Sequence, residues 1–516
     1  MAIWARSVLA VGAALLAAAC GTAPAGGAGH AKAVPRQAAA AAVTVTPDTG
    51  LVGGQPLRVR LTGFPPDSFV ELYECAAPGA CSAVWGVGTG STGSASATFI
   101  AQPSVPSGAG AAWVPCGRRC VLDAVAVKEP VGVPAEPAPA ATARLAFAAG
   151  SPAAATDLAY SSLLSVSWVS ATQGWALAAQ PCSTGTCARL ARTTDAGRHW
   201  QLLPDPPATI QDGTADCQVQ SCVSQVSFAS PAVGYLYGPA LLMTTDGGLT
   251  WHARPGLQTE TLTADGGRAY RITYTSDGCP GPCQPSLQEA PAGTGSWRTL
   301  IGQLAEPGRS DSAQIAVSGP DVVIAMYGSL SGPVPAQAVL YRSADGGGTW
   351  QRAADPCDGL GPGAPRSPGA PGAPGQEEDL IGLAAAPGGF FAGLCVTRAT
   401  MSAFVITSAG AAAWKAAAAP PPGQNLGVIA AAGPAVIAVA SAALGGDGSY
   451  TARLLVTTDA GLRWVTAATD TQDLAAGGVP AWAGFETALD GQWLADPHSV
   501  WTTTDGGLQW TRTVFR

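Results

Sequence analysis

The feature that most constrains this fold is a short motif that returns at near-regular intervals along the 516-residue chain. The pattern Ser/Thr-x-Asp-x-Gly-x-x-Trp, called the box below, occurs at 193–200, 244–251, 343–350, 457–464 and 503–510. Two weaker copies fill the gaps: AGTGSW, ending at Trp297, and TSAGAAAW at 407–414. Successive box tryptophans lie from 46 residues (Trp251 to Trp297) to 64 residues (Trp350 to Trp414) apart. Self-similarity at this period predicts a propeller or another repeat array.

The segments around the boxes predict strands. Upstream of most copies stands a strand, a polar turn that ends in Gly, and a second strand, as in SVSWVSATQGWALA (165–178) and AGFETALDGQWLA (483–495). A third strand leads into the box, as in RLLVTTD (453–459), and a fourth leaves it. Four short antiparallel strands make one propeller blade. The sequence from 158 to 516 therefore predicts a seven-bladed β-propeller.

The residue types of the box predict a structural role. The Asp carboxylate can accept backbone N–H groups across its own turn, and the Gly two residues later supplies a positive φ. The Trp ring can pack on the blade and donate its indole N–H to a turn carbonyl. The copy at 407–414 lacks the Asp and the Gly. This loss fits a structural role, since one blade can lose a stabilising turn while the ring stays folded. We predict fifteen structural residues: Asp195, Gly197, Trp200, Asp246, Gly248, Trp251, Asp345, Gly347, Trp350, Asp459, Gly461, Trp464, Asp505, Gly507 and Trp510.

The motif resembles the Asp box (BNR repeat) of sialidases, sortilin-like receptors and photosystem assembly factors of the Ycf48/HCF136 type. The aromatic-Gly turn followed by TTDGGLTW (244–251) is most similar to the last group. The resemblance implies that the boxes lie at the rim of the propeller, away from its central axis. It carries no photosystem role, because the same repeat is reused in secreted bacterial proteins and fold does not imply function.

The segment before the repeats, 43–149, alternates like strands and carries no helical period. The stretch 43–75 contains two strands, a Gly-Gly turn, a Gly-Phe-Pro-Pro corner and a third strand. A further strand is expected within 90–101 and a disulfide-clipped hairpin at 113–127. This pattern predicts an Ig-like antiparallel β-sandwich of about seven strands. The expected fold class is therefore all-β throughout.

This first domain resembles the neocarzinostatin family, the apoproteins of enediyne chromophores. The resemblance rests on TVTPDTGL (44–51), ELYEC (71–75) with Cys81, TGSASATF (92–99) and the Cys116/Cys120 pair. It implies a cleft at one end of the sandwich that takes a small apolar ligand, with Trp85, Phe99 and Trp113 as candidate lining residues. Core packing of these aromatics is the alternative, and the short Cys75–Cys81 loop favours a stalk or adhesion module.

The chain begins with a predicted export signal at 1–20. Arg6 precedes an apolar run of about a dozen residues, which is too short to span a bilayer. The run ends in small residues and Cys20, followed by Gly21. It resembles a bacterial lipoprotein signal, which implies lipidation of Cys20 and anchoring on the extracellular face of the cell membrane; simple secretion is the alternative. Residues 21–42 are expected to form an Ala/Gly/Pro-rich tether, and 150–157 a linker.

The remaining cysteines predict disulfides. Most stand in close pairs: Cys75/Cys81, Cys116/Cys120, Cys182/Cys187, Cys217/Cys222 and Cys279/Cys283. Cys357 and Cys395 are distant and either find each other or stay free. None of the four histidines (30, 199, 252 and 498) has a zinc-ligand spacing near a pair. Loop-stapling disulfides in an oxidising compartment are expected, with no metal and no cofactor.

The net charge and the sequence motifs restrict the possible functions of the protein. A formal charge of −8 argues against a nucleic-acid partner. AYRITYT (269–275) faintly resembles the arginine motif of sialidases but lacks the following Pro and lies in the third repeat. No serine elbow, metal cluster or phosphate loop appears, and 359–379 is expected to be a Pro/Gly loop. We expect a non-enzymatic scaffold for an envelope protein or glycan; the alternatives are a sialidase-like exo-glycosidase and capture of a small apolar ligand by the first domain.

Overall fold

The computed structural model describes most of the chain between residues 40 and 515. It omits 54, 78–79, 82–84, 108–111, 118–119, 128–140, 149–160, 183–184, 211–221, 255, 266, 275–284, 306–312, 328–336, 362–377, 398–399, 401, 418–419, 421–424, 445–448 and 474–481. Every regular element in the described part is a strand, which confirms the all-β prediction. No helix long and apolar enough to cross a membrane occurs in these residues. The predicted signal with Cys20, nearly all of the tether and the linker lie outside them.

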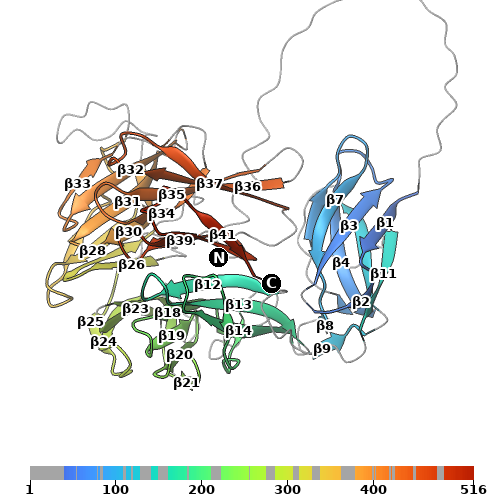
Figure 1. The fold of residues 1–516 in the computed structure, drawn as a ribbon, viewed down its shortest axis with the longest axis horizontal. Helices are drawn as coiled ribbons and strands as arrows, with labels where there is room; N and C mark the ends of the chain where they lie inside the picture. The colour runs from blue at the N-terminus through green and yellow to red at the C-terminus, as the bar shows by residue number, and fades with distance from the viewer. Residues whose placement is uncertain are drawn as a thin grey trace, which may run out of the picture.

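The first domain contains two sheets and a small hairpin (Figure 1). One sheet has the order β1 (Ala42–Thr46), β3 (Pro56–Thr62), β7 (Ala95–Ile100). The other has the order β2 (Thr49–Leu51), β11 (Ala141–Phe147), β10 (Cys120–Val127), β4 (Phe69–Ala77), β5 (Ala80–Cys81), with β6 (Trp85–Gly88) also paired to β4. The hairpin joins β8 (Ser104–Ser107) and β9 (Ala112–Pro115).

One hydrophobic core joins these two sheets. Along β3, Leu57, Val59 and Leu61 are buried while Arg58 and Arg60 alternate with them toward solvent. This is the period of two that a half-buried strand requires. The buried side chains of β3 share one cluster with residues of β4, β10 and β11 from the opposite sheet. The domain is therefore a two-layer sandwich.

Three details of the first domain differ from the sequence-based expectation. The strands flanking Cys116 and Cys120 do not form a hairpin, because β9 pairs with β8 while β10 pairs with β4 and β11. A disulfide across four residues constrains only its own turn and leaves the choice of partner strands to distant segments. The short strand β2 pairs parallel with β11. The shortest strands, such as β2 and β5, also raise the strand number above seven.

Residues 161–515 form seven sheets, each built from one continuous stretch of chain. The first blade contains β12 (Ser162–Trp168), β13 (Gly174–Cys182), β14 (Gly185–Thr193) and β15 (Gln201–Leu202), and it is extended by β16 (Thr209–Ile210) and β17 (Cys222–Val223). The second, third and fourth blades contain β18 (Gln225–Phe228), β19 (Gly234–Tyr237), β20 (Leu241–Thr244) and β21 (His252–Ala253); β22 (Gln258–Asp265), β23 (Arg268–Tyr274), β24 (Ser286–Pro291) and β25 (Arg298–Ile301); and β26 (Ala313–Ser318), β27 (Asp321–Met326), β28 (Val339–Ser343) and β29 (Gln351–Ala353). The fifth, sixth and seventh blades contain β30 (Glu378–Ala386), β31 (Phe390–Thr397), β32 (Ser402–Ala409) and β33 (Ala413–Ala416); β34 (Asn425–Ala431), β35 (Ile437–Leu444), β36 (Ser449–Thr457) and β37 (Val465–Asp473); and β38 (Trp482–Phe485), β39 (Gly491–Asp496), β40 (Ser499–Thr503) and β41 (Thr511–Val514).

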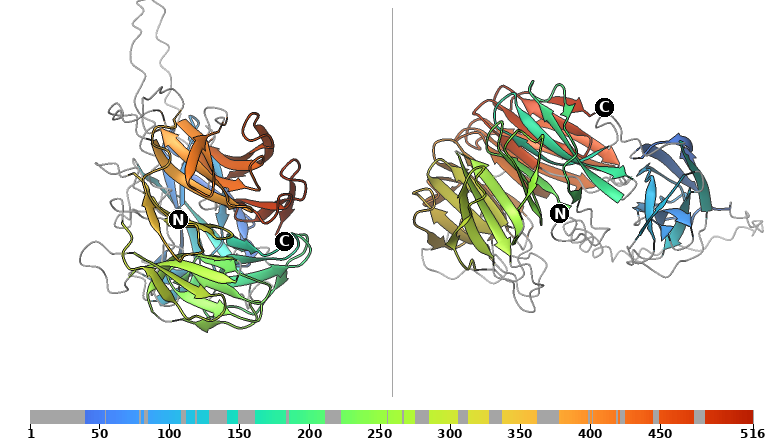
Figure 2. Two further views of the ribbon diagram at one scale, coloured as in Figure 1. Left: turned by 90° about the vertical axis from the view of Figure 1, so that its left-hand side faces the viewer. Right: turned by 90° about the horizontal axis from the view of Figure 1, so that it is seen from below.

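The seven sheets close into a ring. The first strands of successive blades contact one another from β12 to β38. In the left view of Figure 2 the colours run around the ring from green through yellow and orange to red, and the red end returns beside the green start. The last and first blades share no strand. Their seam is closed by the hydrogen bond from Leu163 N to Pro497 O (2.7 Å) and by a core cluster that includes Val166, Leu494 and Phe515.

Side chains of the innermost strands also tie neighbouring blades. Ser165 and Ser167 of β12 accept hydrogen bonds from the backbone N–H groups of Val226 (3.2 Å) and Phe228 (2.8 Å) in β18. These bonds satisfy polar groups that the short first strands leave unpaired toward the next blade. The alternating Ser residues of SVSW are therefore part of the ring.

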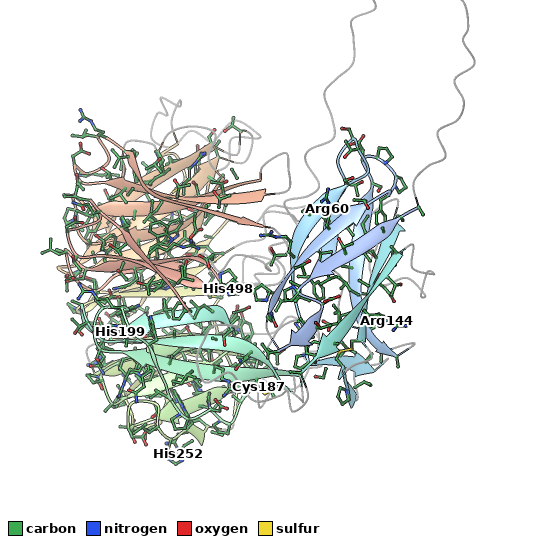
Figure 3. All side chains as sticks on the ribbon, turned by 45° about the vertical axis from the view of Figure 1, so that its right-hand side comes forward. Arg60, Arg144, Cys187, His199, His252 and His498 are labelled. Atoms are coloured by element: carbon green, nitrogen blue, oxygen red, sulfur yellow. A yellow bond between two sulfur atoms is a disulfide. The ribbon has the colours of Figure 1, made fainter. Side chains whose placement is uncertain are left out.

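Strand order divides the propeller into two faces. Connections from first to second strand and from third to fourth strand, the boxes among them, lie on one side, called the box face. Connections from second to third strand and between blades lie on the other, called the loop face. On the box face no connection is longer than a box turn such as 194–200. On the loop face, longer stretches of sequence separate β16 from β17, β27 from β28 and β29 from β30. Figure 3 shows His199 of the box face on the far side from Cys187 and His498 of the loop face.

Candidate interaction face

The boxes share one hydrogen-bond pattern, illustrated by 343–350. Ser343 Oγ donates to Asp345 Oδ1 (2.8 Å) and accepts from Gly347 N (2.8 Å). Asp345 Oδ1 also accepts from Thr349 N (2.8 Å), and Trp350 Nε1 donates to Gly347 O (3.1 Å). The hydrogen bonds from Thr349 and Ser343 lower the pKa of Asp345 to about 2. The boxes at 193–200 and 503–510 repeat these four bonds.

The box turn has one property that its sequence pattern did not reveal. Two successive residues adopt left-handed φ angles, namely Ala196 (62°) and Gly197 (81°) in the first box, and Ala460 (60°) and Gly461 (90°) in the sixth. Only the second position was predicted from the motif. The first position holds Gly in three boxes and Ala in these two. Alanine in this region is strained by its Cβ atom.

Three of the box turns are also hydrogen-bonded to the preceding blade. Trp175 Nε1 donates to Gly247 O of the second box (3.0 Å), and Tyr270 OH donates to Gly346 O of the fourth (3.1 Å). Tyr235 OH accepts from Gly293 N in the third, weaker copy (2.9 Å). The box carboxylates are thus engaged by their own turns, and these three turns are hydrogen-bonded to the preceding blade. This geometry favours the structural role predicted for the fifteen residues.

A tyrosine–glutamate pair, which sialidases use as a nucleophile, exists in the propeller. Tyr270 and Glu289 are directly opposite one another on β23 and β24. Glu289 forms ion pairs with Arg268 (3.3 Å) and Arg298 (3.0 Å). Tyr270 is only 2% exposed, burial raises the pKa of its phenol, and its hydroxyl is bonded to the box of the next blade. The pair therefore ties two blades and presents no accessible nucleophile.

Arg271, the arginine of AYRITYT, does not assemble a carboxylate clamp. Its side chain is 7% exposed and donates to Gln288 Oε1 from Nε (3.0 Å) and Nη2 (2.7 Å), and to Thr259 Oγ1 from Nη1 (3.3 Å). The guanidinium lies 4.2 Å from the ring centroid of Trp297, and burial lowers the pKa of Arg271 to about 10. These neutral partners belong to the same blade, and no ion pair involves Arg271 in the described part of the chain.

The first domain gives a partial answer about the predicted ligand cleft. Phe99 is fully buried in the core between the two sheets, which is the packing alternative left open by the sequence. Trp85 lies on β6 and Trp113 on β9, and their side chains fall outside what the structure describes. Of the three candidate residues, only Phe99 is thus placed, and it lines no open surface.

Four disulfides are present in the described part of the chain. They join Cys75 to Cys81, Cys116 to Cys120, Cys182 to Cys187 and Cys357 to Cys395. The last settles the question that the sequence left open, because Cys357 and Cys395 find each other across 38 residues.

The other two expected disulfides are not both placed. Cys222 is disulfide-bonded, but Cys217, its expected partner, lies outside the described residues. Cys279 and Cys283, which the sequence predicts as a pair, also lie outside them, between β23 and β24. The Cys279–Cys283 bond and the identity of the partner of Cys222 therefore stay predictions.

Among the described residues, one group of side chains is close enough together to hold a metal ion. It consists of Glu74, Cys116 and Cys120, whose ligand atoms lie within 4.8 Å of one another. The two cysteines are joined in a disulfide, and a metal ligand must be a free thiolate. This group therefore does not fit a metal ion.

A buried carboxylate organises the loop face beside the Cys357–Cys395 bond. Asp355 accepts hydrogen bonds from Ala338 N (3.1 Å), Cys357 N (2.9 Å) and Leu380 N (3.1 Å), which belong to three separate segments. Burial raises the pKa of Asp355 to about 6 despite these bonds. The ends of the connections on this face are therefore held by the hydrogen bonds to Asp355 and by the Cys357–Cys395 disulfide.

A second buried network, between the sixth and seventh blades, is called the seam network below. Asp470 of β37 and Asp496 of β39 are both 3% exposed. Arg512 of β41 pairs with both, through Nε to Asp470 (3.2 Å) and Nη2 to Asp496 (3.0 Å), and Trp501 Nε1 donates to Asp470 (2.9 Å). Burial raises the pKa of Asp470, and the neighbouring Asp496 adds to this effect. The network fixes β37 to the last blade.

The loop face is turned toward the first domain. Ser104 Oγ of β8 donates to Cys182 O at the end of β13 (2.9 Å), and β8 contacts β14. Figure 3 shows Cys187 and His498 on the side of the propeller nearest the first domain. A partner on this face would therefore meet propeller loops and, at one edge, the β8–β9 hairpin.

No protein-family model matches the sequence, and a search of curated proteins finds no match. Among solved structures, the chain is similar to YCF48 bound to D1 peptide, with 18% identity over 67% of this chain and 93% of that one and a TM-score of 0.42. It is also similar to PorZ of Porphyromonas gingivalis (10% identity, 90% and 68% coverage, TM-score 0.41) and to the Hadza microbial sialidase Hz136 (11%, 92% and 84%, 0.30). Because these TM-scores are below 0.5, the architecture assigned to this protein rests on its own seven sheets and two-layer sandwich.

Proposed function

We propose that this protein is a non-enzymatic interaction scaffold of the bacterial cell envelope whose propeller binds a protein or glycan partner through its loop face. One observation carries the proposal, namely the difference between the two faces. The box face consists of short turns repeated from blade to blade, whereas the loop face carries connections of unequal length held by disulfides and by Asp355. Recognition uses variable loops on a rigid scaffold.

The placement of titratable groups supports binding over catalysis. The Tyr270–Glu289 pair is buried in an inter-blade tie, Arg271 is held by neutral side chains, and the box carboxylates are bonded within their turns. A glycoside hydrolase needs two carboxyl groups facing a substrate. The carboxyl groups of Asp345, Glu289 and Asp470 are instead held by hydrogen bonds or ion pairs within the propeller.

The N-terminal region completes the proposal. A lipid on Cys20 anchors the chain, residues 21–42 act as a tether, and the first domain, with its Ig-like and neocarzinostatin-like pattern, serves as a stalk beside the loop face. On this proposal the protein acts outside the cell membrane. Fractionation and metabolic labelling with a fatty acid would test the anchor, with Cys20→Ser as the control.

The face assignment is tested by site-specific photocrosslinking in native envelopes. A photoreactive residue replaces Thr400, exposed on the loop face between β31 and β32, and in a matched variant Gln509, exposed on the box face. We expect one stoichiometric adduct from position 400 and none from 509. The reverse pattern would reject the loop face. Release of sugar from fluorogenic glycosides by the purified full chain would instead support the hydrolase alternative.

A further inference from the structure

The outermost strand of the sixth blade differs from all the others. β37 has nine residues, whereas the fourth strands of the other blades have two to four. The outermost strand of a sheet leaves one row of backbone N–H and C=O groups unpaired, and short edge strands limit the length of this row. Among the outermost strands that the structure describes, only β37 therefore offers a long edge.

The first blade shows how the chain covers such an edge elsewhere. Its hairpin β13–β14 also has strands of nine residues. There the connection to the next blade adds β16, which pairs with β14 at Cys187 and Thr209, and β17, which pairs with β16. In the sixth blade β37 ends the sheet, and no backbone hydrogen bond reaches its outer edge in the part of the chain that the structure describes.

The edge of β37 also lacks the usual protection. Lysine, proline or an inward-pointing charge normally guards an exposed edge. The sequence VTAATDTQD contains no Lys, Arg or Pro. Its charged residues are Asp470, which Arg512 neutralises in the seam network, and Asp473 at the end of the strand. The single irregularity in register falls beside Ala467, so 468–473 pairs regularly with β36. Thr469 and Thr471 are exposed on the side away from Asp470.

The seam network holds this edge in place. Asp470 lies in the middle of the regular segment and is bonded to Arg512 and Trp501 of the seventh blade. A fixed edge loses little conformational entropy when a new strand pairs with it. The start of β36 and the end of β37 lie on the loop face and extend toward the first domain (Figure 1).

We propose that the outer edge of β37, residues 468–473, is a strand-addition site that takes an extended segment of a partner polypeptide. This inference rests on the proposed function and makes it more specific. Only an extended backbone matches a row of alternating N–H and C=O groups. Arg453, opposite Thr469 on β36, places a cation next to the exposed threonines. The edge therefore favours a segment of β-branched, uncharged residues with an acidic side chain near Arg453.

Photocrosslinking with a register readout tests the site. Benzoylphenylalanine replaces Thr469 or Thr471 in the full-length protein, and Thr511, exposed on the outermost strand β41, is the matched control. We expect adducts from 469 and 471, with the crosslinked partner residue shifting by two between them, and no adduct from 511. Adducts without this shift, or to a second copy of this chain, would overturn the proposal.

A charge-guard variant provides an independent test. Thr469→Glu with Thr471→Glu leaves the buried side of β37 unchanged but places two anions on the edge, which repel the acidic side chain expected near Arg453. We expect at least a tenfold weaker affinity for the crosslinked segment, prepared as a synthetic peptide, and an unchanged unfolding temperature. Thr511→Glu should change neither. Undiminished peptide binding would refute strand addition. If photocrosslinking gives an adduct from position 400 but none from 469 and 471, strand addition at β37 is rejected and the loop-face scaffold is retained. If none of the three positions gives an adduct, both proposals are rejected.

Discussion

Glu74 gives the sharpest test of the energetics of this structure. It lies on β4 on the same side as Val70 and Leu72, inside the sandwich core, and is fully buried. Its Oε2 accepts a hydrogen bond from Gln102 N (2.8 Å), and its Oε1 lies 3.6 Å from Cys116 Sγ. Burial in this apolar surrounding raises the pKa of Glu74 to about 8, and the hydrogen bond from Gln102 offsets only part of this shift.

The sign and size of the effect follow from proton linkage. In the unfolded chain the carboxyl ionises near its ordinary value of 4.5, whereas in the folded chain it keeps its proton up to about 8. Folded-state stability is therefore lost as pH rises from 4.5 toward 8, by about 1.4 kcal/mol for each pH unit. At pH 7 the loss amounts to roughly 3 kcal/mol. Glu74→Gln keeps an acceptor oxygen for Gln102 and removes the ionisation.

Calorimetry of the full chain measures this difference. We expect Glu74→Gln to raise the stability of the first-domain transition only slightly at pH 5 and by about 3 kcal/mol at pH 7. Asp48→Asn, at an exposed position of the same domain, is the control and should show no such trend. A gain that is equal at both pH values, or a loss at pH 7, would refute the assignment of a neutral, buried carboxyl.

Three further predictions concern the propeller. Ala460→Gly relieves a left-handed φ of 60° and should stabilise the chain by about 0.5–1 kcal/mol in denaturant titrations, and a loss of stability would contradict the strain. Arg512→Met leaves the two aspartates of the seam network uncompensated. This substitution should lower the free energy of unfolding by about 2 kcal/mol at pH 7, which is less than for a fully buried pair because Arg512 is 40% exposed. The loss should be smaller at pH 4, and a loss that does not depend on pH would argue against the network. Cys357→Ser with Cys395→Ser opens a loop of 38 residues and should cost about 4 kcal/mol, read as a lower unfolding temperature under non-reducing conditions; an unchanged temperature would show that the bond contributes little.

Short-range features were predictable from the sequence. The box is one example, since Ser343, Asp345 and Gly347 bond to one another within a single turn. The same holds for the three close cysteine pairs that the structure describes, whose partners are separated by four to six residues. Because these interactions join neighbours in the chain, residue type and spacing are enough to identify them.

Features that join distant segments could not be predicted from the sequence. Tyr270 and Glu289 meet only because β23 and β24 adopt one register. β9 and β10 separate into different pairings although a disulfide joins the ends of the turn between them. Glu74 looks like an ordinary strand carboxylate until the second sheet covers it. In each case the partner is chosen by packing and not by spacing.

The amino-acid sequence by itself determined the all-β class, the repeat of seven blades and the chemistry of the box turn, because periodicity and turn residues act over a few positions. Only the tertiary structure decided which carboxyl groups are buried and that Cys357 meets Cys395. It also decided that, among the described strands, β37 ends its sheet whereas β14 is extended by β16. These outcomes depend on which strand ends come together when seven sheets close a ring. Closure is a collective property of the whole chain, since each blade buries its faces only against its two neighbours.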